Sequence, residues 1–568
     1  MTKRIAFAFF CVILLAFVAC EPEEKIVEVE VIVDNTLYVT VSADMVDNIV
    51  QGTTVTLYAV DSVANITPGD LTYSWFSSDG DMLVAEGDTV QWRAPDEAGS
   101  YTVTVHATDG TNIGIGTINL GVEVFAATVD PYFVGDGTCA GCHSSTHTAW
   151  AETGHAHAWS SLMSNDYAAS YCYPCHSVGF DDVSGNSGYD EAPILKFVNV
   201  QCESCHGPGS THATSLSPAD IAYDYDAASC GSCHEGSHHP YLSEWEDSPH
   251  NYSAESAHGA PVNGGCEGCH EGVAAARRLE GDLSVFFGGA AYGSPAREYT
   301  LAYPIAGITC QVCHDSHDAT NPGQIRTVAD VQLVDANGET PIITDGGVGK
   351  LCMQCHHARR AAESQIENGY AHFGPHANPQ ADFMAAKSAY HGVADASFAW
   401  TGPSHLNVQN SCKTCHINMV EYNPTDGAIT GHTFEPTVEA CANCHGTITS
   451  FDEIMALEDF DGDGTVEGVQ SEVGGLLHLL EAAFVANGLD TTGTSYMGAL
   501  GDTLRSTYVV REAGYNYAFV EDDKSMGVHN PDYAIQLLQQ SYFHLTGAMP
   551  ANAYILEGDV MTTEYSVK

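Results

Sequence analysis

The chain has 568 residues, which is enough for several domains, and its hydrophobic fraction of 44% allows a sizeable core. Only 18 lysines and arginines face 73 aspartates and glutamates. The resulting net charge of −55 excludes a nucleic-acid binder and a protein that docks on anionic lipid through a basic patch. The 20 cysteines and 28 histidines do not suit a disulfide scaffold, because such scaffolds are short.

The N-terminus has the pattern of an export signal. Lys3 and Arg4 precede an apolar stretch that ends at Ala19, directly before Cys20, and the stretch is too short to favour a membrane span. A small residue followed by cysteine resembles the bacterial lipobox. The resemblance implies a lipoprotein signal peptide at 1–19, lipidation of Cys20 and an acidic tether at 20–35. A plain signal peptide cut elsewhere is the alternative.

Residues 36–128 contain no cysteine and show alternating hydrophobic patterns with frequent turns. This pattern predicts a β-sandwich. The segments Tyr73-Ser-Trp75 and Tyr101-Thr-Val-Thr-Val105 resemble immunoglobulin-like or PKD-type domains of surface proteins, which implies a spacer without chemistry of its own. The expected strands are 37–41, 54–58, 71–76, 89–92 and 101–105.

Between 129 and 450 the motif Cys-x-x-Cys-His occurs nine times, and regular hydrophobic periodicity is poor. The nine pairs use 18 cysteines, and Cys11 and Cys20 complete the 20. The cysteine pairs are Cys139 and Cys142, Cys172 and Cys175, Cys202 and Cys205, Cys230 and Cys233, Cys266 and Cys269, Cys310 and Cys313, Cys352 and Cys355, Cys412 and Cys415, and Cys441 and Cys444.

This motif is typical of covalently bound haem. Two thiols three positions apart can each add to one vinyl group, and the histidine that follows can coordinate the iron. Zinc would need motifs in pairs and no fixed histidine, and nine is an odd number. We therefore predict nine haem c groups, which also supply the core that such a loop-rich segment lacks. The proximal ligands are His143, His176, His206, His234, His270, His314, His356, His416 and His445.

Second axial ligands are expected among the other histidines. His155 and His250 each end a W-x-x-[ST]-x-H pattern, and His212 and His317 closely follow a haem motif. These patterns resemble the cytochrome c554-like multihaem family, and more widely the octahaem hydroxylamine oxidoreductases and bacterial extracellular multihaem cytochromes, over about 137–449. The resemblance implies that such histidines are distal ligands, often of a neighbouring haem.

Five further histidines in Gly-, Pro- or Ser-rich loops complete nine distal candidates: His239, His258, His376, His405 and His432. For each, a surface or hydrogen-bonding histidine is the alternative. Met163, Met384 and Met419 are more consistent with core packing. Reserve candidates are His147, His157, His238, His357, His372, His391 and His529; the last precedes a helix that resembles the C-terminal helices of multihaem reductases.

The region 451–568 is expected to be helical, with helices at 472–485 and 531–543, the second capped by Asn530. Ahead of them, an acidic loop fits positions 1, 3, 5, 7 and 9 of an EF-hand with Asp459, Asp461, Asp463, Thr465 and Glu467. Position 12 is Gln470 instead of glutamate, although Glu472 is nearby. The loop predicts a structural Ca²⁺ site, with a merely acidic turn as the alternative.

Together these features predict a multidomain chain: a β-sandwich at 36–128, a loop-rich, mostly α nonahaem cytochrome domain at 129–450, and C-terminal helices. The predicted function is electron transfer along closely spaced, mainly bis-histidine haems, at the outer membrane or outside a bacterial cell. Partners would be other cytochromes, outer-membrane conduits, or mineral and terminal acceptors, and a homopolymer is one form the chain could take. The alternative is a hydroxylamine oxidoreductase-like enzyme with one open haem. A purely structural surface protein would not explain nine motifs.

Overall fold

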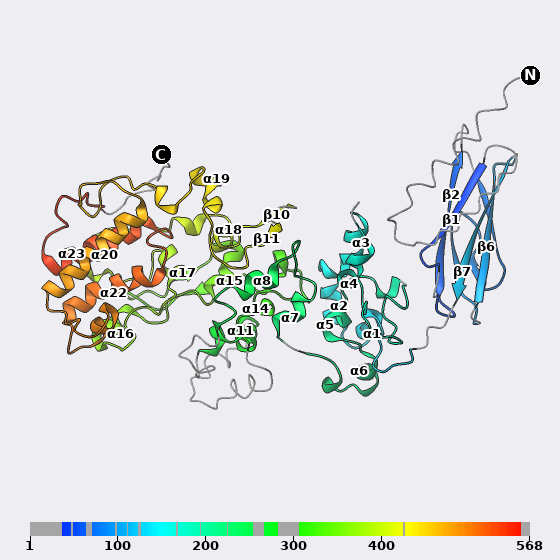
Figure 1. The fold of residues 1–568 in the computed structure, drawn as a ribbon, viewed down its shortest axis with the longest axis horizontal. Coiled ribbons are helices and arrows are strands. Elements are labelled where there is room, and N and C mark those ends of the chain that lie inside the picture. The colour runs from blue at the N-terminus through cyan, green and yellow to red at the C-terminus, as the bar shows by residue number, and fades with distance from the viewer. Residues whose placement is uncertain are drawn as a thin grey trace, which may run out of the picture. The chain divides into compact units, whose positions relative to one another are not determined.

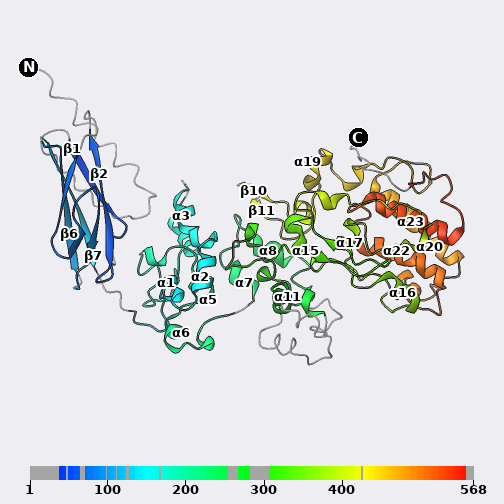
Figure 2. The same ribbon diagram turned by 180° about the vertical axis from the view of Figure 1, so that it is seen from behind.

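The computed structural model describes residues 37–557 apart from 47–48, 64–70, 97–98, 111, 123–126, 166–167, 194, 224, 254–265, 282–305 and 424–426. The predicted signal peptide, Cys20, the tether and His258 lie outside the described residues. The chain divides into two compact units, shown in Figures 1 and 2: residues 1–224 with 316–319, and residues 225–315 with 320–568.

The first unit begins with two antiparallel sheets, in the strand orders β1-β2-β5-β4 and β3-β6-β7. Their inward side chains form one core that includes Val39, Leu57, Trp92, Val105 and Leu120. The predicted β-rich region is therefore present, with two strands more than expected. The strands are β1 Leu37–Ala43, β2 Thr54–Val63, β3 Thr72–Ser77, β4 Asp81–Val84, β5 Thr89–Arg93, β6 Gly99–Thr108 and β7 Ile113–Val122.

The rest of the first unit consists of loops and one- or two-turn helices around a small apolar cluster of Phe133, Val178, Ala192 and Phe197. The helices are α1 Asp136–Ala140, α2 Ser144–Trp150, α3 Ala158–Met163, α4 Tyr173–His176, α5 Cys202–His206 and α6 Ser210–Ser215. Such short helices have no stability of their own in water, so their positions depend on what they are attached to.

The second unit continues this loop-rich construction up to residue 445. Its helices there are α7 Ala227–Gly231, α8 Tyr241–Glu246, α10 Glu267–His270, α11 Gly272–Leu279, α14 Cys310–Cys313, α15 Lys350–Met353, α16 Ala362–Asn368, α17 Gln380–Met384, α18 Cys412–His416 and α19 Ala442–His445. Two small hairpins pair β8 Val331–Gln332 with β9 Ile342–Ile343 and β10 Val420–Asn423 with β11 Gly427–Ile429.

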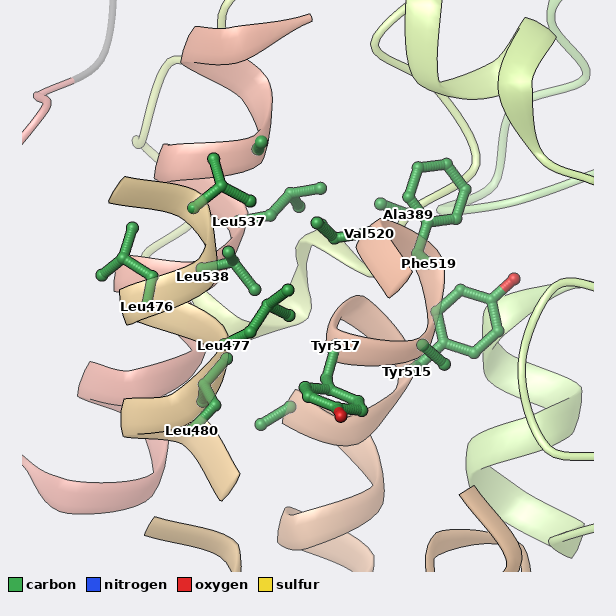
Figure 3. Packing of buried hydrophobic residues seen from close by; sticks show 14 of the residues in the cluster. Ala389, Leu476, Leu477, Leu480, Tyr515, Tyr517, Phe519, Val520, Leu537 and Leu538 are labelled. Carbon is green, nitrogen blue, oxygen red and sulfur yellow. The ribbon is translucent and has the colours of Figure 1, made fainter. Parts of the chain in front are cut away.

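Four helices complete the second unit: α20 Val469–Ala486, α21 Tyr496–Gly501, α22 Tyr508–Asp523 and α23 Pro531–Thr546. Leu476, Leu477 and Leu480 of α20 lie beside Leu537 and Leu538 of α23 in Figure 3, with Tyr517 and Val520 of α22 close to them. This core also contains buried residues between 362 and 389, so the C-terminal helices pack as one body with part of the haem-motif segment.

Both predicted C-terminal helices are present, slightly longer than expected, whereas α22 was not predicted. Asn530 does occupy the N-cap position of α23, but its side chain makes no capping bond there. Its amide instead donates to the carbonyl oxygens of Phe383 and Gly402. Of the described residues, no helix combines the length and apolar character that a membrane span needs.

Asp382 on α17 is a fully buried carboxyl within this second unit. Its Oδ2 accepts a hydrogen bond from the backbone N–H of Ala358 at 2.6 Å. Burial raises the pKa of Asp382 from 3.8 to about 6, because the charged form loses its hydration. The folded protein therefore binds this proton more tightly than the unfolded chain does.

The raised pKa predicts that ionisation of Asp382 lowers the stability of the folded chain as the pH rises, and that Asp382→Asn removes this dependence. The stability linked to a raised carboxyl pKa is complete below pH 3.8 and is lost as the pH rises through about 6. The free energy of unfolding of D382N relative to the unmodified chain should therefore increase by up to about 3 kcal/mol between these limits. Urea unfolding at several pH values, followed by far-UV circular dichroism, measures this difference.

Asp490→Asn is the control, because that carboxyl is exposed and hydrogen bonds from Thr492 lower its pKa. Its trend should be small and opposite in sign. A D382N curve that runs parallel to that of the unmodified chain at all pH values would contradict the role given to Asp382.

Candidate haem-binding sites

Each described Cys-x-x-Cys-His motif is folded as about one turn of helix. The backbone N–H of the histidine donates to the carbonyl oxygen of the first cysteine at 2.9–3.1 Å in the motifs that begin at 139, 230, 266, 310 and 352. Residues i, i+3 and i+4 of a helical turn lie on one face. The two thiols and the imidazole of a motif therefore lie on the same side of the backbone, as attachment to one haem requires.

The cysteines form no other kind of site within the described residues. None of the 18 motif cysteines, which all lie among the described residues, forms a disulfide. The described residues contain one close group of three or more metal-ligating side chains, and it consists of aspartates alone. A disulfide framework and tetrahedral zinc sites built from the motifs are thus not supported.

The structure brings seven motif histidines together with a second histidine. The ring centroids of each pair are 6.0–6.5 Å apart. The pairs are His143 with His212, His206 with His317, His270 with His376, His314 with His432, His356 with His250, His416 with His529, and His445 with His405.

This separation fits an ion held between two imidazoles. Imidazole nitrogens bind first-row metals at about 2 Å, which places the centroids of two opposed rings roughly 6 Å apart. Seven pairs within half an ångström of one another indicate a common geometry instead of chance packing of histidines. The donor set therefore fits haem iron with two axial histidines.

Hydrogen bonds at Nδ1 orient many of these rings. Backbone carbonyl oxygens lie 2.6–2.9 Å from Nδ1 of His176, His206, His212, His314, His405 and His416. A histidine whose Nδ1–H donates in this way presents its free Nε2 to a metal. The pattern extends to His176, which has no second histidine among the ring pairs of the described residues.

The two W-x-x-[ST]-x-H segments fold alike. The indole N–H of Trp150 donates to Val200 O at 3.2 Å, and that of Trp245 to Ile308 O at 2.8 Å. In return, the N–H groups of Val200 and Ile308 donate to the carbonyl oxygens of the histidines that end the two patterns. Val200 and Ile308 each lie two residues before a haem motif, which begins at Cys202 and at Cys310. These hydrogen bonds therefore attach each pattern to the backbone just ahead of a haem motif.

The distal candidates separate into three groups. Six of them face a motif histidine: His212, His250, His317, His376, His405 and His432. In four of these pairs, those of His250, His317, His376 and His432, the two histidines are more than 100 residues apart in the sequence. Burial lowers the pKa of His155. The carbonyl oxygen of His155 accepts the N–H of Val200, and that of His176 accepts the N–H of the preceding residue, Asn199. His239 lies beside His238. His529, only a reserve candidate in the sequence, faces His416 at 6.2 Å.

Other reserve histidines have different partners. His147 binds Asp136 at 2.7 Å, His238 stacks on Tyr422, and His391 binds the hydroxyl of Tyr533 at 2.8 Å. Met384 packs in an apolar cluster with Val331 and Leu406, as expected for a core residue. These contacts explain why the residues are not arranged opposite a motif histidine.

Contacts between cysteines of different motifs show which sites adjoin. Side-chain hydrogen bonds link Cys139 with Cys202, Cys230 with Cys310, Cys269 with Cys355, and Cys352 with Cys412. Cys313 also lies near Cys352, and Cys441 near Cys415. Since each sulfur would be bonded to a porphyrin edge, these contacts bring the attachment edges of neighbouring haems together.

Comparison with known proteins agrees with this geometry. The family model of cytochrome c554 and c-prime matches residues 138–207, which contain the first three motifs. Cytochrome c-554 of Nitrosomonas europaea is 35% identical over 96 residues, which is 14% of this chain and 40% of that protein. The chain is a multihaem c-type cytochrome. It spans less than half the length of the curated relative.

Two solved structures share part of the arrangement of this cytochrome. The outer cell wall cytochrome OcwA has a TM-score of 0.46 at 18% identity, covering 73% of this chain and all of that one. An undecahaem cytochrome from the S-layer of Carboxydothermus ferrireducens has a TM-score of 0.45 at 17% identity, covering 74% of this chain and 70% of that one.

A cavity of about 2080 Å³ runs through the second unit of the cytochrome, along the motifs that begin at 266, 352, 412 and 441. Ordinary ligand pockets measure about 300–1,000 Å³, so this space is large enough for more than one cofactor. Burial lowers the pKa of His250 to about 3 and that of His376 to about 4. Both imidazoles are therefore neutral near pH 7, which is the form that binds metal.

Few cationic side chains are available in this acidic cytochrome, yet several lie at the cavity. Arg359, Arg360 and Lys524 line it, and Arg278 reaches the Sγ of Cys355 at 3.0 Å. Two acidic propionates accompany each haem, so cations here suit the cofactor. Four of the 18 lysines and arginines of the chain are therefore placed at or near this cavity.

The predicted calcium loop brings its aspartates together. Oxygens of Asp459, Asp461 and Asp463 all lie within 4.8 Å of one another, and Glu467 is outside this group. Thr465 donates its backbone N–H to Asp463 Oδ1 at 2.7 Å. Glu472 is outside this group, and its oxygens accept the N–H groups of Phe460, Asp461 and Glu467.

Removing one distal candidate should expose one iron. In His432→Ala, the site of His314 loses the ring 6.5 Å away, and its haem should change from six-coordinate low-spin to five-coordinate high-spin. Electron paramagnetic resonance of the oxidised protein should then show one new high-spin signal. His478→Ala is the control, because that side chain is 82% exposed on α20. An unchanged spectrum for H432A would contradict the pairing.

Proposed function

We propose that this cytochrome is a nonahaem electron carrier whose haems have mainly two histidine ligands. The observation that supports the proposal best is the repeated imidazole pair at 6.0–6.5 Å. A haem c held in such a pair supplies reversible one-electron exchange between ferric and ferrous iron, without an open position for substrate. The cysteines tether each macrocycle, and the imidazoles fix its orientation.

The order of the sites supports conduction. Numbered along the chain, site 1 adjoins site 3 in the first unit through Cys139 and Cys202. In the second unit, sulfur contacts connect sites 4 and 6, 5 and 7, and 7 and 8, while electrostatic interaction between thiols connects sites 6 and 7 and sites 8 and 9. Site 7, at Cys352 and Cys355, thus has three neighbours and is a branch point in the proposed path.

A buried carboxylate, Glu203, and a half-buried one, Glu244, hold these neighbouring sites in position. Glu203, inside the third motif, accepts N–H groups from Val134 and Gly135, directly ahead of the first motif. Glu244 accepts from the backbone of Thr430 and His432, and so fixes the ring that faces His314. The chain's own residues therefore set the spacing that electron exchange needs.

The proposed location is outside the inner membrane of a bacterium, with lipid attachment through Cys20. The export pattern of residues 1–19 supports it. The two-sheet region, which resembles immunoglobulin or PKD domains in sequence, would act as a spacer. Proposed partners are other cytochromes, outer-membrane conduits, and mineral or terminal acceptors; assembly into a homopolymer belongs to the same proposal. The strong negative charge favours partners with cationic surfaces.

Intact mass of the chain, produced with a haem-attachment system, tests this proposal. We expect nine added haem masses and a low-spin spectrum, because nine cysteine pairs are available. The double variant Cys441→Ala, Cys444→Ala should lose one haem and leave eight. Absence of added macrocycles would contradict the proposal. A high-spin signal that responds to hydroxylamine or nitrite in the unmodified protein would favour the oxidoreductase alternative.

We also propose a structural Ca²⁺ in the loop of Asp459, Asp461, Asp463, Thr465 and Glu467. Mutual repulsion and burial raise the pKa of Asp461, and a cation would relieve this repulsion. Calcium should therefore raise the thermal unfolding midpoint of the chain, and Asp461→Asn should reduce the gain. Asp502→Asn, at an exposed carboxyl outside the loop, is the control. An equal calcium effect in D461N would contradict the proposal.

A further inference from the structure

One candidate ligand differs from the others in its hydrogen-bond partner. The Nδ1 of His529 lies 2.7 Å from Oδ1 of Asp523, whereas backbone carbonyl oxygens serve the other described ligands with such bonds. The Asp523 side chain is completely buried. The neighbouring Lys524 does not neutralise it, because that ammonium pairs with Glu521.

Both carboxyl oxygens of Asp523 have hydrogen-bond partners. Oδ2 accepts the hydroxyl of Ser525 and its backbone N–H, while Oδ1 faces the imidazole. A carboxylate can only accept, and it has capacity for all three donors. A hydrogen bond from Nδ1–H to an anion is stronger than one to a neutral carbonyl, and it makes Nε2 a more basic ligand.

Both effects of this pair favour ferric iron at site 8. A more basic imidazole stabilises the higher charge of the oxidised state, and a buried negative charge does so through space at a low effective dielectric constant. Two other pairs in the second unit have uncharged partners at Nδ1: His405 donates to Val528 O, and Nδ1 of His432 lies near the hydroxyl and the carbonyl oxygen of Thr430.

We propose that Asp523 is a positioning residue that acts through His529 and gives the site of Cys412, Cys415 and His416 the lowest reduction potential in the second unit. The inference rests on the proposed electron-carrier function. Site 8 lies between sites 7 and 9. Because it has the lowest reduction potential of the three, it is the last of them to be reduced. An electron that moves from site 7 to site 9 must then pass through a haem of lower reduction potential, which is an uphill step.

Asp523→Asn tests the inference in the full haem-loaded chain. Asparagine keeps the size of the side chain and a carbonyl oxygen for Nδ1–H, but it removes the charge. We expect the midpoint potential of the most negative component of a spectroelectrochemical titration to rise by about 59 mV. This shift corresponds to a roughly ten-fold increase in the ratio of reduced to oxidised haem for one electron. The other components should stay in place.

Glu512→Gln is the matched control. Glu512 also holds a histidine, His544, with a 3.0 Å contact on the helices α22 and α23, and its substitution removes the same charge. Neither residue belongs to a haem site. The most negative component should be unchanged in E512Q. An equal shift in both variants would overturn the inference, because it would reflect net charge alone.

Ser525→Ala provides a second, opposite test that keeps the carboxylate. Loss of the serine hydroxyl leaves more negative charge on Asp523, so the same component should fall. If D523N does not fold, a fall in S525A supports the inference and an unchanged or raised component overturns it. If all haem masses are present and D523N moves no component, the inference fails while the electron-carrier function stands. If no haem is attached, the proposed function itself fails.

Discussion

The organisation of the haem-motif segment depends on one constraint, the fixed separation of two imidazoles across a shared iron. Helices such as α4, α5 and α14 have four or five residues, which is too few for a stable isolated helix. Their histidines nevertheless meet partners from remote segments, as His206 meets His317 and His356 meets His250. In the proposed haem-bound chain, ligation would replace the contacts that an apolar core supplies, and it would close long loops between motifs.

The C-terminal helices show the opposite principle, since they bury an ordinary apolar core. This core extends into the haem-motif segment through residues such as Phe383 and Ala389. Cavity-lining residues and core residues alternate there: Gln380 and Met384 line the cavity, while Phe383 faces the helices. One short helix, α17, thus joins a region organised by ligands to a region organised by burial.

The sequence predicted the features with a local signature and missed those that depend on distant contacts. The haem motifs, most strands and the helices at 469–486 and 531–546 follow from spacing and periodicity. Strand β7 was missed because Gly114 and Gly116 interrupt its pattern; a Cβ on either would come within 2.9 Å of atoms of Val39. Pairing of distal histidines with motifs could not be predicted, because the partners are set by the folded chain. Two local patterns gave a usable signal: the W-x-x-[ST]-x-H pattern for His250, and the short distance after a haem motif for His212 and His317.

His529 illustrates how burial and ligation meet at one turn. Asp523 ends α22, Lys524 turns the chain in a left-handed conformation, and Pro531 begins α23. The seven-residue connection between these buried helices places His529 opposite His416, with its Nδ1 against Asp523. Because α22 and α23 are fixed by the apolar core, the imidazole and the carboxylate are held before any ligand binds. The other described parts of the segment have smaller apolar clusters, such as that of Phe133 and Val178, so bound haem would there supply more of the order than it does at this turn.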